Sequence, residues 1–324
     1  MSNLEPDPDE LVVDGQPAAS IQVLEPREVP LGGPRAMTVR RTLPQRARSL
    51  IGAWCFVDHY GPDDVAETGG MVVPPHPHTG LQTVSWLFEG EVEHRDSTGA
   101  WARVRPREVN LMTAGRGIQH SEVSTPDTTR LHGAQLWVAL PDADRHTTPL
   151  FEHDEPTPIT LGAATLRVFV GQLANSNRAR VTTFSPLLGL QLDLPAAATV
   201  ELPVDPSFEH GLLVDAGTAL LDDHPIATAH LGYRGPGAST LRVAATDGPL
   251  RALLLGGAPL GEPIVMWWNF IGRDHDEIVA YREQWQDEVI DESDPAGRFG
   301  EVSGWHGQAL PAPALPTVRL KPRD

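Results

Sequence analysis

The sequence predicts an all-β protein built of two similar barrels in tandem, with one helix near the C-terminus. The 324 residues include 30 Gly and 31 Pro spread along the chain, and this composition favours short strands joined by many turns. Turn signals such as Asp222-Asp223 and Gly235-Pro236-Gly237 recur between apolar stretches. A weak internal repeat relates the strand and turn around Gly90 to those around Gly217. This pattern is typical of one architecture used twice.

The composition along the chain predicts four consecutive parts. Residues 1–20 are acidic and rich in Pro and Asp, which is typical of a mobile tail. Residues 21–165 form the predicted first barrel, and residues 166–295 form the predicted second barrel with its terminal helix. Residues 296–324 contain a Pro-rich run at 308–316, which indicates an extended tail. A chain of this length can bury the cores of two domains.

One helix is indicated between residues 274 and 290. Asp274 and Glu277 have the D-x-x-E spacing of a capping box, in which the N-cap side chain accepts a hydrogen bond from the first turn of the helix. Apolar residues follow at helical spacing and should pack against a sheet: Ile278, Tyr281, Trp285 and Val289. The residues between them should face water: Arg282, Glu283 and Asp287.

Charge and cysteine content exclude several classes of protein. The formal net charge of −18 argues against direct binding to the phosphates of nucleic acid. The Arg-rich stretch from Arg40 to Arg48 is a local exception, for which a solvated face is the simpler explanation. Cys55, the single cysteine, lies in an apolar run, which predicts a buried thiol and no internal disulfide. The N-terminus lacks a signal pattern and no apolar run reaches the ~20 residues of a membrane helix, so we expect a cytoplasmic protein that does not bind membranes.

Two short motifs, His76-Pro77-His78 and His120-Ser121-Glu122, provide three imidazoles and a carboxylate. Within each motif the polar side chains are two residues apart, so on a strand both project to the same face. The gap of 42 residues between the motifs (120 − 78) leaves room for several strands to bring them together. Inside a barrel the four groups could hold one divalent transition metal ion. The competing interpretation is that these histidines belong to surface turns.

An unbroken strand through His76 would extend the face of the first motif. Parity then places these residues on one face, polar at its start and apolar further on: His76, His78, Gln82, Val84, Trp86 and Phe88. Ligand type does not choose among Fe(II), Mn, Co, Ni, Cu and Zn. Four protein ligands on an octahedral ion leave two positions open, whereas a tetrahedral zinc ion with the same ligands is closed and structural.

Other polar residues near the motifs have two interpretations each. His94 and Asp96 could support a ligating histidine from behind, or they could belong to a polar turn. His132 and Trp137 fit a core or an interface as well as a site wall. The remaining histidines have no partner at ligand spacing and stay unassigned: His59, His146, His153, His210, His224, His230, His275 and His306.

The repeat predicts that only the first half carries a metal. Aligning Gly90 with Gly217 gives an offset of 127 residues. Without gaps, the four candidate ligands then correspond to other residue types in the second half: Pro203, Asp205, Asp247 and Pro249. Residues 166–324 contain no H-x-H pair, and their one H-x-E pair, His275-Asp276-Glu277, lies in the predicted helix, so the second barrel is expected to be metal-free.

Three segments of the first half resemble the signature of the pirin family. They are residues 75–85, which contain the first motif, residues 94–97, and residues 112–122, which end on the second motif. Asp58-His59-Tyr60-Gly61-Pro62, residues 131–141 and Trp268-Asn269-Phe270-Ile271 agree with this signature. The resemblance extends from about residue 37 to residue 290 and is densest over residues 75–122.

The resemblance implies two tandem cupin domains, each a double-stranded β-helix or jelly-roll barrel. It implies that His76, His78, His120 and Glu122 bind one iron ion, most simply Fe(II), and that the C-terminal cupin is empty. An ordinary cupin has its carboxylate a few residues after the H-x-H pair, where this chain has Gln82. Pirins share this departure and take the acid from the position of Glu122.

Quercetin 2,3-dioxygenase activity is associated with some pirins. The resemblance therefore implies an enzyme that cleaves a flavonol, or another small aromatic chelating substrate, with O2. Glu122 would act as the base that removes the hydroxyl proton of the substrate. Other pirins act through protein partners, which implies a metal- or redox-responsive regulatory protein as the alternative.

Overall fold

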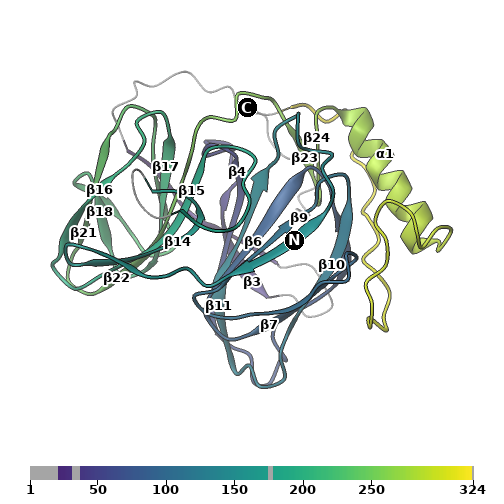
Figure 1. The fold of residues 1–324 in the computed structure, drawn as a ribbon, viewed down its shortest axis with the longest axis horizontal. Coiled ribbons are helices and arrows are strands. Elements are labelled where there is room, and N and C mark those ends of the chain that lie inside the picture. The colour runs from purple at the N-terminus through teal and green to yellow at the C-terminus, as the bar shows by residue number, and fades with distance from the viewer. Residues whose placement is uncertain (1–20, 31–36, 174–177, 323–324) are drawn as a thin grey trace.

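The computed structural model describes residues 21–30, 37–173 and 178–322, and it confirms the predicted fold class. Two β-barrels stand side by side, and α1 (His275–Trp285), the one α-helix of the described residues, lies on the outer side of the first (Figure 1). Each barrel combines a seven-stranded sheet with a four-stranded sheet. The predicted mobile tail, residues 1–20, lies outside the described residues.

The strands of the first barrel come from residues 27–154. Its seven-stranded sheet contains, in spatial order, β12 (Leu150–Asp154), β9 (Val109–Thr113), β6 (Leu81–Glu89), β11 (Arg130–Ala139), β4 (Trp54–Asp64), β3 (Thr38–Leu43) and β2 (Arg27–Pro30). Its four-stranded sheet contains β5 (Val72–His78), β10 (Ile118–Ser124), β7 (Val92–Asp96) and β8 (Trp101–Val104). The two candidate motifs therefore lie on neighbouring strands of the smaller sheet.

The second barrel repeats this arrangement. Its seven-stranded sheet contains β1 (Gln22–Leu24), β20 (Leu231–Arg234), β17 (Glu209–Ala216), β22 (Leu250–Gly257), β15 (Leu187–Leu194), β14 (Ala164–Gly171) and β13 (Ile159–Leu161). Its four-stranded sheet contains β16 (Thr199–Pro203), β21 (Thr240–Ala245), β18 (Ala219–Leu221) and β19 (His224–Ile226). Strands β1, β13 and β14 begin within residues 21–165, because backbone pairing recruits them into the sheet of the second barrel.

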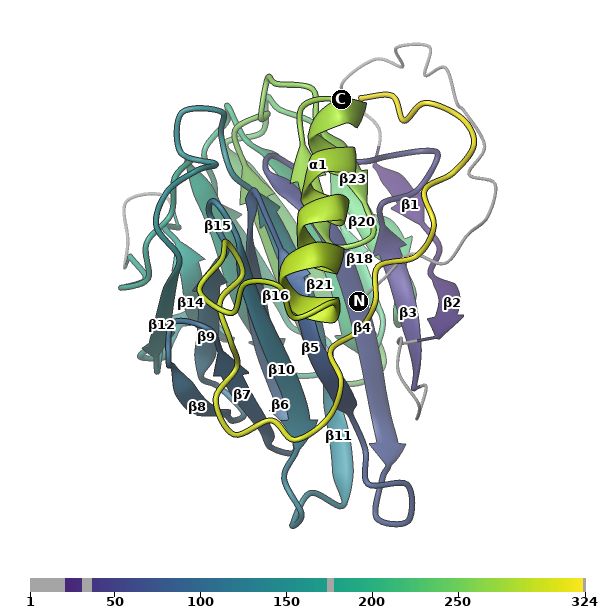
Figure 2. The same cartoon turned by 90° about the vertical axis from the view of Figure 1, so that its right-hand side faces the viewer.

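The helix follows the second barrel in the sequence but packs on the first. A hairpin of β23 (Val265–Trp267) and β24 (Phe270–Gly272) leads into α1, and Ile271 N donates to Thr79 O of the first barrel at 3.1 Å. A π-helical turn, η1 (Gln286–Ile290), extends α1. The C-terminal arm, residues 291–322, then runs across the outside of β5, β10 and β7 (Figure 2). There Leu310 N donates to Pro75 O at 2.8 Å.

The helix has the predicted cap and apolar stripe. Asp274 is the N-cap, and its side chain accepts from Glu277 N at 2.9 Å. Three residues of the predicted stripe are buried, and the fourth is partly buried within η1: Ile278, Tyr281, Trp285 and Val289. Arg282 faces water only in part, because the C-terminal arm contacts it and Pro313 O accepts from its Nε at 2.7 Å.

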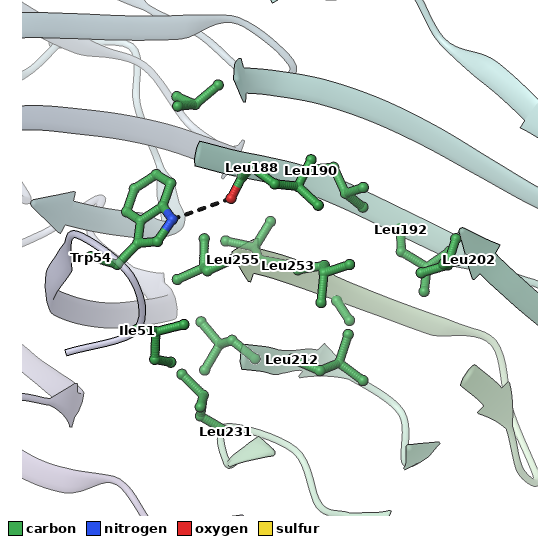
Figure 3. Packing of buried hydrophobic residues seen from close by; sticks show 14 of the residues in the cluster. Ile51, Trp54, Leu188, Leu190, Leu192, Leu202, Leu212, Leu231, Leu253 and Leu255 are labelled. Carbon is green, nitrogen blue, oxygen red and sulfur yellow. Dashed lines mark hydrogen bonds between the residues drawn. The ribbon is translucent and has the colours of Figure 1, made fainter. Parts of the chain in front are cut away.

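A continuous apolar core joins the two barrels. Figure 3 shows Trp54 of β4 beside the leucine-rich core of the second barrel. Its indole N–H donates to Leu188 O at 3.2 Å and to Gly256 O at 3.1 Å. At Gly52 the backbone is left-handed, with φ of 55°, and a Cβ would lie 2.6 Å from Gly257 Cα. Only glycine allows this close approach of the barrels.

The strand through His76 is interrupted, and the parity argument fails beyond residue 78. Gly80 separates β5 from β6 with φ of 69°, and a Cβ there would lie 2.5 Å from Ile271 O. After this turn the odd-numbered Ser85 faces Glu122, while the even-numbered Trp86 donates to Gln191 Oε1 of the second barrel at 2.9 Å. The prediction of one shared face is therefore wrong for these residues: Gln82, Val84, Trp86 and Phe88.

The repeat is present in the topology, but its offset changes along the chain. An offset of 127 relates the starts of β5 and β16 (199 − 72) and of β7 and β18 (219 − 92). The starts of β10 and β21 differ by only 122 (240 − 118), because β18, β19 and the turn between them are shorter than β7, β8 and their turn. The ungapped correspondence of His120 and Glu122 with Asp247 and Pro249 is therefore wrong, since both of these follow β21. Among the described residues, no cluster of three metal-ligand side chains lies wholly in the second barrel.

Three predictions about composition have different outcomes. Cys55 is buried as predicted, and burial raises the pKa of its free thiol. Arg41, within the Arg-rich stretch, is not on a solvated face: it is 2% exposed and donates to both oxygens of Asp58 at 2.7 and 2.8 Å. The ion pair compensates its charge, which allows the guanidinium to be buried. No helix in the described part of the chain has the length and apolarity needed to cross a bilayer.

Candidate metal centre

Strands β5 and β10 bring the two predicted motifs face to face. The antiparallel ladder sets His76 opposite His120, and its register shifts between His120 and Glu122. Such an irregularity changes the direction of the side chains that follow it. On the other side of β10, β7 places Asp96 opposite His120 and His94 opposite Glu122. One small sheet therefore carries both motifs and the two residues predicted to support them.

Three of the four predicted ligands form one cluster. One ring nitrogen from each of His76, His78 and His120 lies within 4.8 Å of the other two. The Nε2 atoms of His78 and His120 are 3.1 Å apart, and the three side chains are 1–2% exposed. His76 Nδ1 lies 2.9 Å from Pro74 O. Because a carbonyl only accepts, this nitrogen carries the proton and leaves Nε2 with a free lone pair.

Burial keeps these imidazoles neutral. It lowers the pKa of His76 to about 3. It also lowers the pKa values of His78 and His120 well below their usual range, and the neighbouring histidines lower them further. A neutral imidazole has one nitrogen with a free lone pair, which is the form that binds a metal.

The spacing of the rings fits a shared cation. Two nitrogens that each lie about 2.1 Å from one ion are separated by ~3.0 Å at a right angle and by ~3.4 Å at a tetrahedral angle. The 3.1 Å between Nε2 of His78 and Nε2 of His120 lies in this range. Without an ion, a neutral ring that carries its proton on Nε2 can donate to the other ring across this distance. When both Nε2 atoms are unprotonated, their lone pairs point at the same place, and a cation between them removes the repulsion. The donor set suits a divalent transition metal.

Glu122 adjoins this cluster through His120. Its carboxylate lies within 4.8 Å of ligand atoms of His120 and His94, in a group that does not include the other two histidines. Burial raises the pKa of Glu122. Ser85 Oγ lies 3.3 Å from Glu122 Oε1 and 2.8 Å from Gln135 Oε1. Both roles predicted for Glu122, as fourth ligand and as base, stay predictions.

Trp137 and Gln82 lie on different sides of the barrel wall. The Trp137 ring meets His78 edge-on, with centroids 5.1 Å apart, so it lines the site. Gln82 faces away, because its Nε2 donates to Thr113 Oγ1 at 2.9 Å and to Thr182 O at 3.1 Å. The residue at the usual position of the cupin acid therefore does not point at the imidazoles.

His94 and Asp96 lie behind His120. His94 Nδ1 is 3.3 Å from His120 Nδ1, and His94 Nε2 is 3.1 Å from Asp96 Oδ2. Both side chains are buried. These contacts favour a supporting role for the pair over the interpretation as a polar turn alone.

The sequence did not predict a second buried cluster, which lies between the barrels. The Nε2 atoms of His59 and His132 lie 2.7 and 2.6 Å from Asp215 Oδ1, and they are 3.3 Å apart. Arg251 Nε bonds to Asp215 Oδ2, and its Nη2 lies 3.5 Å from His132 Nδ1. No local pattern marks these residues, since His59 is 73 residues from His132 and 156 from Asp215.

Charge distinguishes this second cluster from the first. Burial opposes ionisation of Asp215, but hydrogen bonds from His132 and His59 outweigh it and hold its pKa well below the usual range. Arg251 already neutralises the carboxylate, so a dication would add uncompensated positive charge to a buried interface. The N–O distances of 2.6 and 2.7 Å are those of charge-assisted hydrogen bonds. This cluster is a hydrogen-bonded ion pair that links the barrels.

Comparisons with known proteins identify the family. The pirin family model matches residues 36–138, and the model of the pirin C-terminal cupin domain matches residues 189–291. A Pseudomonas aeruginosa protein, provisionally named as a quercetin 2,3-dioxygenase, is 42% identical over 91% of this chain and 91% of its own length. The chain belongs to the pirin family.

Two further similar proteins agree with this assignment. A pirin-like protein of Caulobacter vibrioides is 34% identical over 85% of this chain and 94% of its own length. The crystal structure of quercetin 2,3-dioxygenase from Acinetobacter baumannii superposes with a TM-score of 0.85 at 37% identity, covering 93% of this chain and 97% of that one. The two barrels are cupin domains, as the resemblance implied.

Proposed function

We propose that this pirin is a metal-dependent dioxygenase of the quercetin 2,3-dioxygenase type, most simply with one Fe(II) ion per chain. The observation that carries the proposal is the buried cluster of neutral imidazoles at ion-sharing distance beside a buried carboxylate. The names of the relatives from Pseudomonas aeruginosa and Acinetobacter baumannii support the same reaction class. The substrate is a flavonol or another small aromatic chelator, with O2 as the second substrate.

The residues of the site have different proposed roles. His76, His78 and His120 would hold the ion, and the chemistry it would supply there is a lowered pKa of a coordinated hydroxyl and orientation of the two substrates. Glu122 takes the proton from that hydroxyl, and because burial raises its pKa, its ionised form is a stronger base than an exposed glutamate. Ser85 holds one oxygen of this carboxylate. In the overall reaction both atoms of O2 enter the flavonol, two C–C bonds of its central ring break, and carbon monoxide leaves.

The burial of the site favours a second candidate function. The candidate ligands are at most 6% exposed, which suits an ion that shapes a surface better than one that a bulky flavonol reaches directly. The alternative proposal is therefore a metal- or redox-responsive regulatory protein. With a net charge of −18, such a regulator acts through a protein partner and not through direct contact with nucleic acid.

Anaerobic reconstitution with Fe(II) followed by exposure to quercetin and O2 tests the enzyme. We expect one ion per chain, oxygen-dependent loss of quercetin absorbance and release of carbon monoxide. His120→Ala should lose the ion and the activity together. His224→Ala, at an exposed histidine of the second barrel, is the matched control and should keep both.

Two results would change the assignment. Wild-type protein that binds Fe(II) but consumes quercetin no faster than His120→Ala contradicts the dioxygenase. A pull-down that returns one stoichiometric protein partner, retained by the Fe(II) form and released by the Fe(III) form, supports the regulator.

A further inference from the structure

His120 uses both of its ring nitrogens. Its Nε2 lies 3.1 Å from Nε2 of His78, and its Nδ1 lies 3.3 Å from Nδ1 of His94. The two nitrogens of an imidazole point in different directions, so His94 lies behind His120 as seen from His78. His94 therefore contacts a candidate ligand without joining the three-imidazole cluster.

The rings of His78, His120 and His94 form a row, and the buried carboxylate of Asp96 lies at its end. Asp96 Oδ2 lies 3.1 Å from His94 Nε2. Its other oxygen accepts from Thr98 N at 2.8 Å and from Thr98 Oγ1 at 2.6 Å, and such donors favour the ionised carboxylate. An ionised carboxylate only accepts hydrogen bonds. The proton of this contact therefore belongs to His94 Nε2.

The position of this proton determines the next one. When Nε2 is the only protonated nitrogen of His94, the ring has a lone pair at Nδ1 and accepts there. His120 must then donate from its own Nδ1 across the 3.3 Å contact. Its Nε2 is left unprotonated and faces His78, which is the arrangement that a metal ligand requires.

Neighbouring residues hold the side chains of Asp96 and His94 in place. The other oxygen of Asp96 accepts from Thr98 N at 2.8 Å, from Thr98 Oγ1 at 2.6 Å and from Ala100 N at 3.3 Å, all in the β7–β8 turn. The His94 ring stacks on Phe151 of β12, with centroids 4.6 Å apart and planes at 23°. Rotation of either side chain would lose these contacts, so the proton arrangement is a fixed property of the fold.

We propose that Asp96 and His94 are positioning residues of the metal centre, which fix His120 in the tautomer that presents its Nε2 to the ion. The inference rests on the proposed binding of an ion by His76, His78 and His120, and it does not depend on the substrate. The two oxygens of Asp96 have separate tasks, since one closes the turn and the other sets the tautomer.

Asp96→Asn tests the proposal because it changes the donor pattern with almost no change in shape. The amide oxygen can keep the bonds of the turn, while an N–H group replaces the oxygen that faces His94. His94 Nε2 must then accept, which moves the ring proton to Nδ1 and forces His120 to carry its proton on Nε2. We expect Asp96→Asn to weaken Ni(II) binding by about 10–100-fold, measured by competition with a chelating dye.

Two further variants separate positioning from folding. His94→Phe removes the contacts of the ring nitrogens with His120 and Asp96 but can keep the stacking on Phe151. In this background Asp96→Asn should lower Ni(II) affinity by less than about a further twofold, because the coupling between His94 and Asp96 is already lost. His224→Ala, at an exposed histidine of the second barrel, should leave Ni(II) affinity unchanged. Circular dichroism checks that each variant is folded.

Nitrogen-15 NMR of the apo protein supplies a readout besides affinity. His120 should be protonated on Nδ1 in the wild type and on Nε2 in Asp96→Asn. Equal Ni(II) affinity in these two proteins, or an undiminished loss in the His94→Phe background, overturns the proposal. Neither measurement uses quercetin, so a wild type that binds Ni(II) without consuming quercetin contradicts the dioxygenase alone.

Discussion

The two barrels have equivalent strand orders but opposite interiors. Where β5 and β10 carry His76, His78 and His120, the equivalent strands β16 and β21 carry buried aliphatic residues: Leu202, Leu241 and Val243. The first interior thus contains polar donors that need a partner, whereas the second is filled by side chains that need only contact. Burial of aliphatic side chains stabilises a fold directly, while buried polar donors are costly unless they are satisfied. The same architecture therefore surrounds a cluster of histidines in one half and an apolar core in the other.

His210 is a polar residue in the apolar surroundings of the second barrel. It lies on β17, and the offset of 127 places it at the position of Thr83 in β6 (210 − 127). It is 1% exposed, and neither ring nitrogen has a hydrogen-bond partner. A single imidazole in an apolar interior is only a destabilising group, whereas three that converge can share an ion. The two interiors therefore differ in whether several histidine side chains point at one place, and not in whether a histidine is present.

Removing Asp215 is expected to have the largest effect on the contact between the barrels. Asp215→Ala deprives His59, His132 and Arg251 of their shared acceptor. Loss of one member of a buried pair costs about 3–5 kcal/mol, and we expect about 3 kcal/mol of unfolding free energy here because Arg251 is 32% exposed and can rehydrate. Urea denaturation measures the loss. Asp193→Ala, at a carboxylate that is 36% exposed, is the control and should cost less than about 1 kcal/mol.

The metal content of Asp215→Ala tests whether the cluster between the barrels binds an ion. If the cluster between the barrels is an ion pair, as its charges indicate, Asp215→Ala still binds one ion per chain. A fall from two ions to one would show instead that His59, His132 and Asp215 hold a metal.

Acidification should destabilise the second barrel through His210. Burial lowers the pKa of His210 from its usual 6.5 to about 4, with Asp205 and Asp222 opposing the shift and Arg234 adding to it. Above pH 6.5 both the folded and the unfolded protein are neutral at this residue, so its full contribution to stability is present. Between pH 6.5 and 4 the unfolded chain takes up the proton first, and stability falls by at most about 3 kcal/mol.

The comparison of wild type with His210→Leu isolates this contribution. The variant should lose less stability than the wild type between pH 6.5 and 4, measured by urea denaturation across that range. His224→Ala, at an exposed histidine of the same barrel, should retain the wild-type slope. Equal slopes in wild type and His210→Leu would show that His210 is not buried neutral.

The candidate ligands could be predicted from the sequence because each pair is local. The i, i+2 spacing of His76 with His78 needs only strand periodicity to place both side chains on one face. The same argument failed across Gly80, because a lone glycine in a strand pattern does not reveal a left-handed turn. At that turn Ile271, from a distant segment of the chain, comes so close that no Cβ would fit at residue 80.

Features that depend on packing between distant segments could not be predicted. The cap of α1 at Asp274 and its apolar stripe are local and were predicted, but the sequence does not show that the helix packs on the first barrel. His59, His132 and Asp215 meet only because the seven-stranded sheets of the two barrels face each other, and each looks like an isolated polar residue in its own strand. Sequence periodicity reports the face of an element, whereas its partner depends on the whole fold.

Replacing Trp54 should cause the smallest loss of unfolding free energy, and this loss should be specific to the contact between the barrels. Trp54→Phe removes the indole N–H that Leu188 O and Gly256 O of the second barrel share, and we expect a loss of about 1–2 kcal/mol because those buried acceptors lose a partner. Trp285→Phe removes a comparable bond to Leu310 O of the C-terminal arm, outside the contact between the barrels. If the Trp54 bond couples the barrels, only Trp54→Phe should separate loss of the bound ion from unfolding of the second barrel along a urea titration. Coincident transitions in both variants would show that the apolar core alone holds the barrels together.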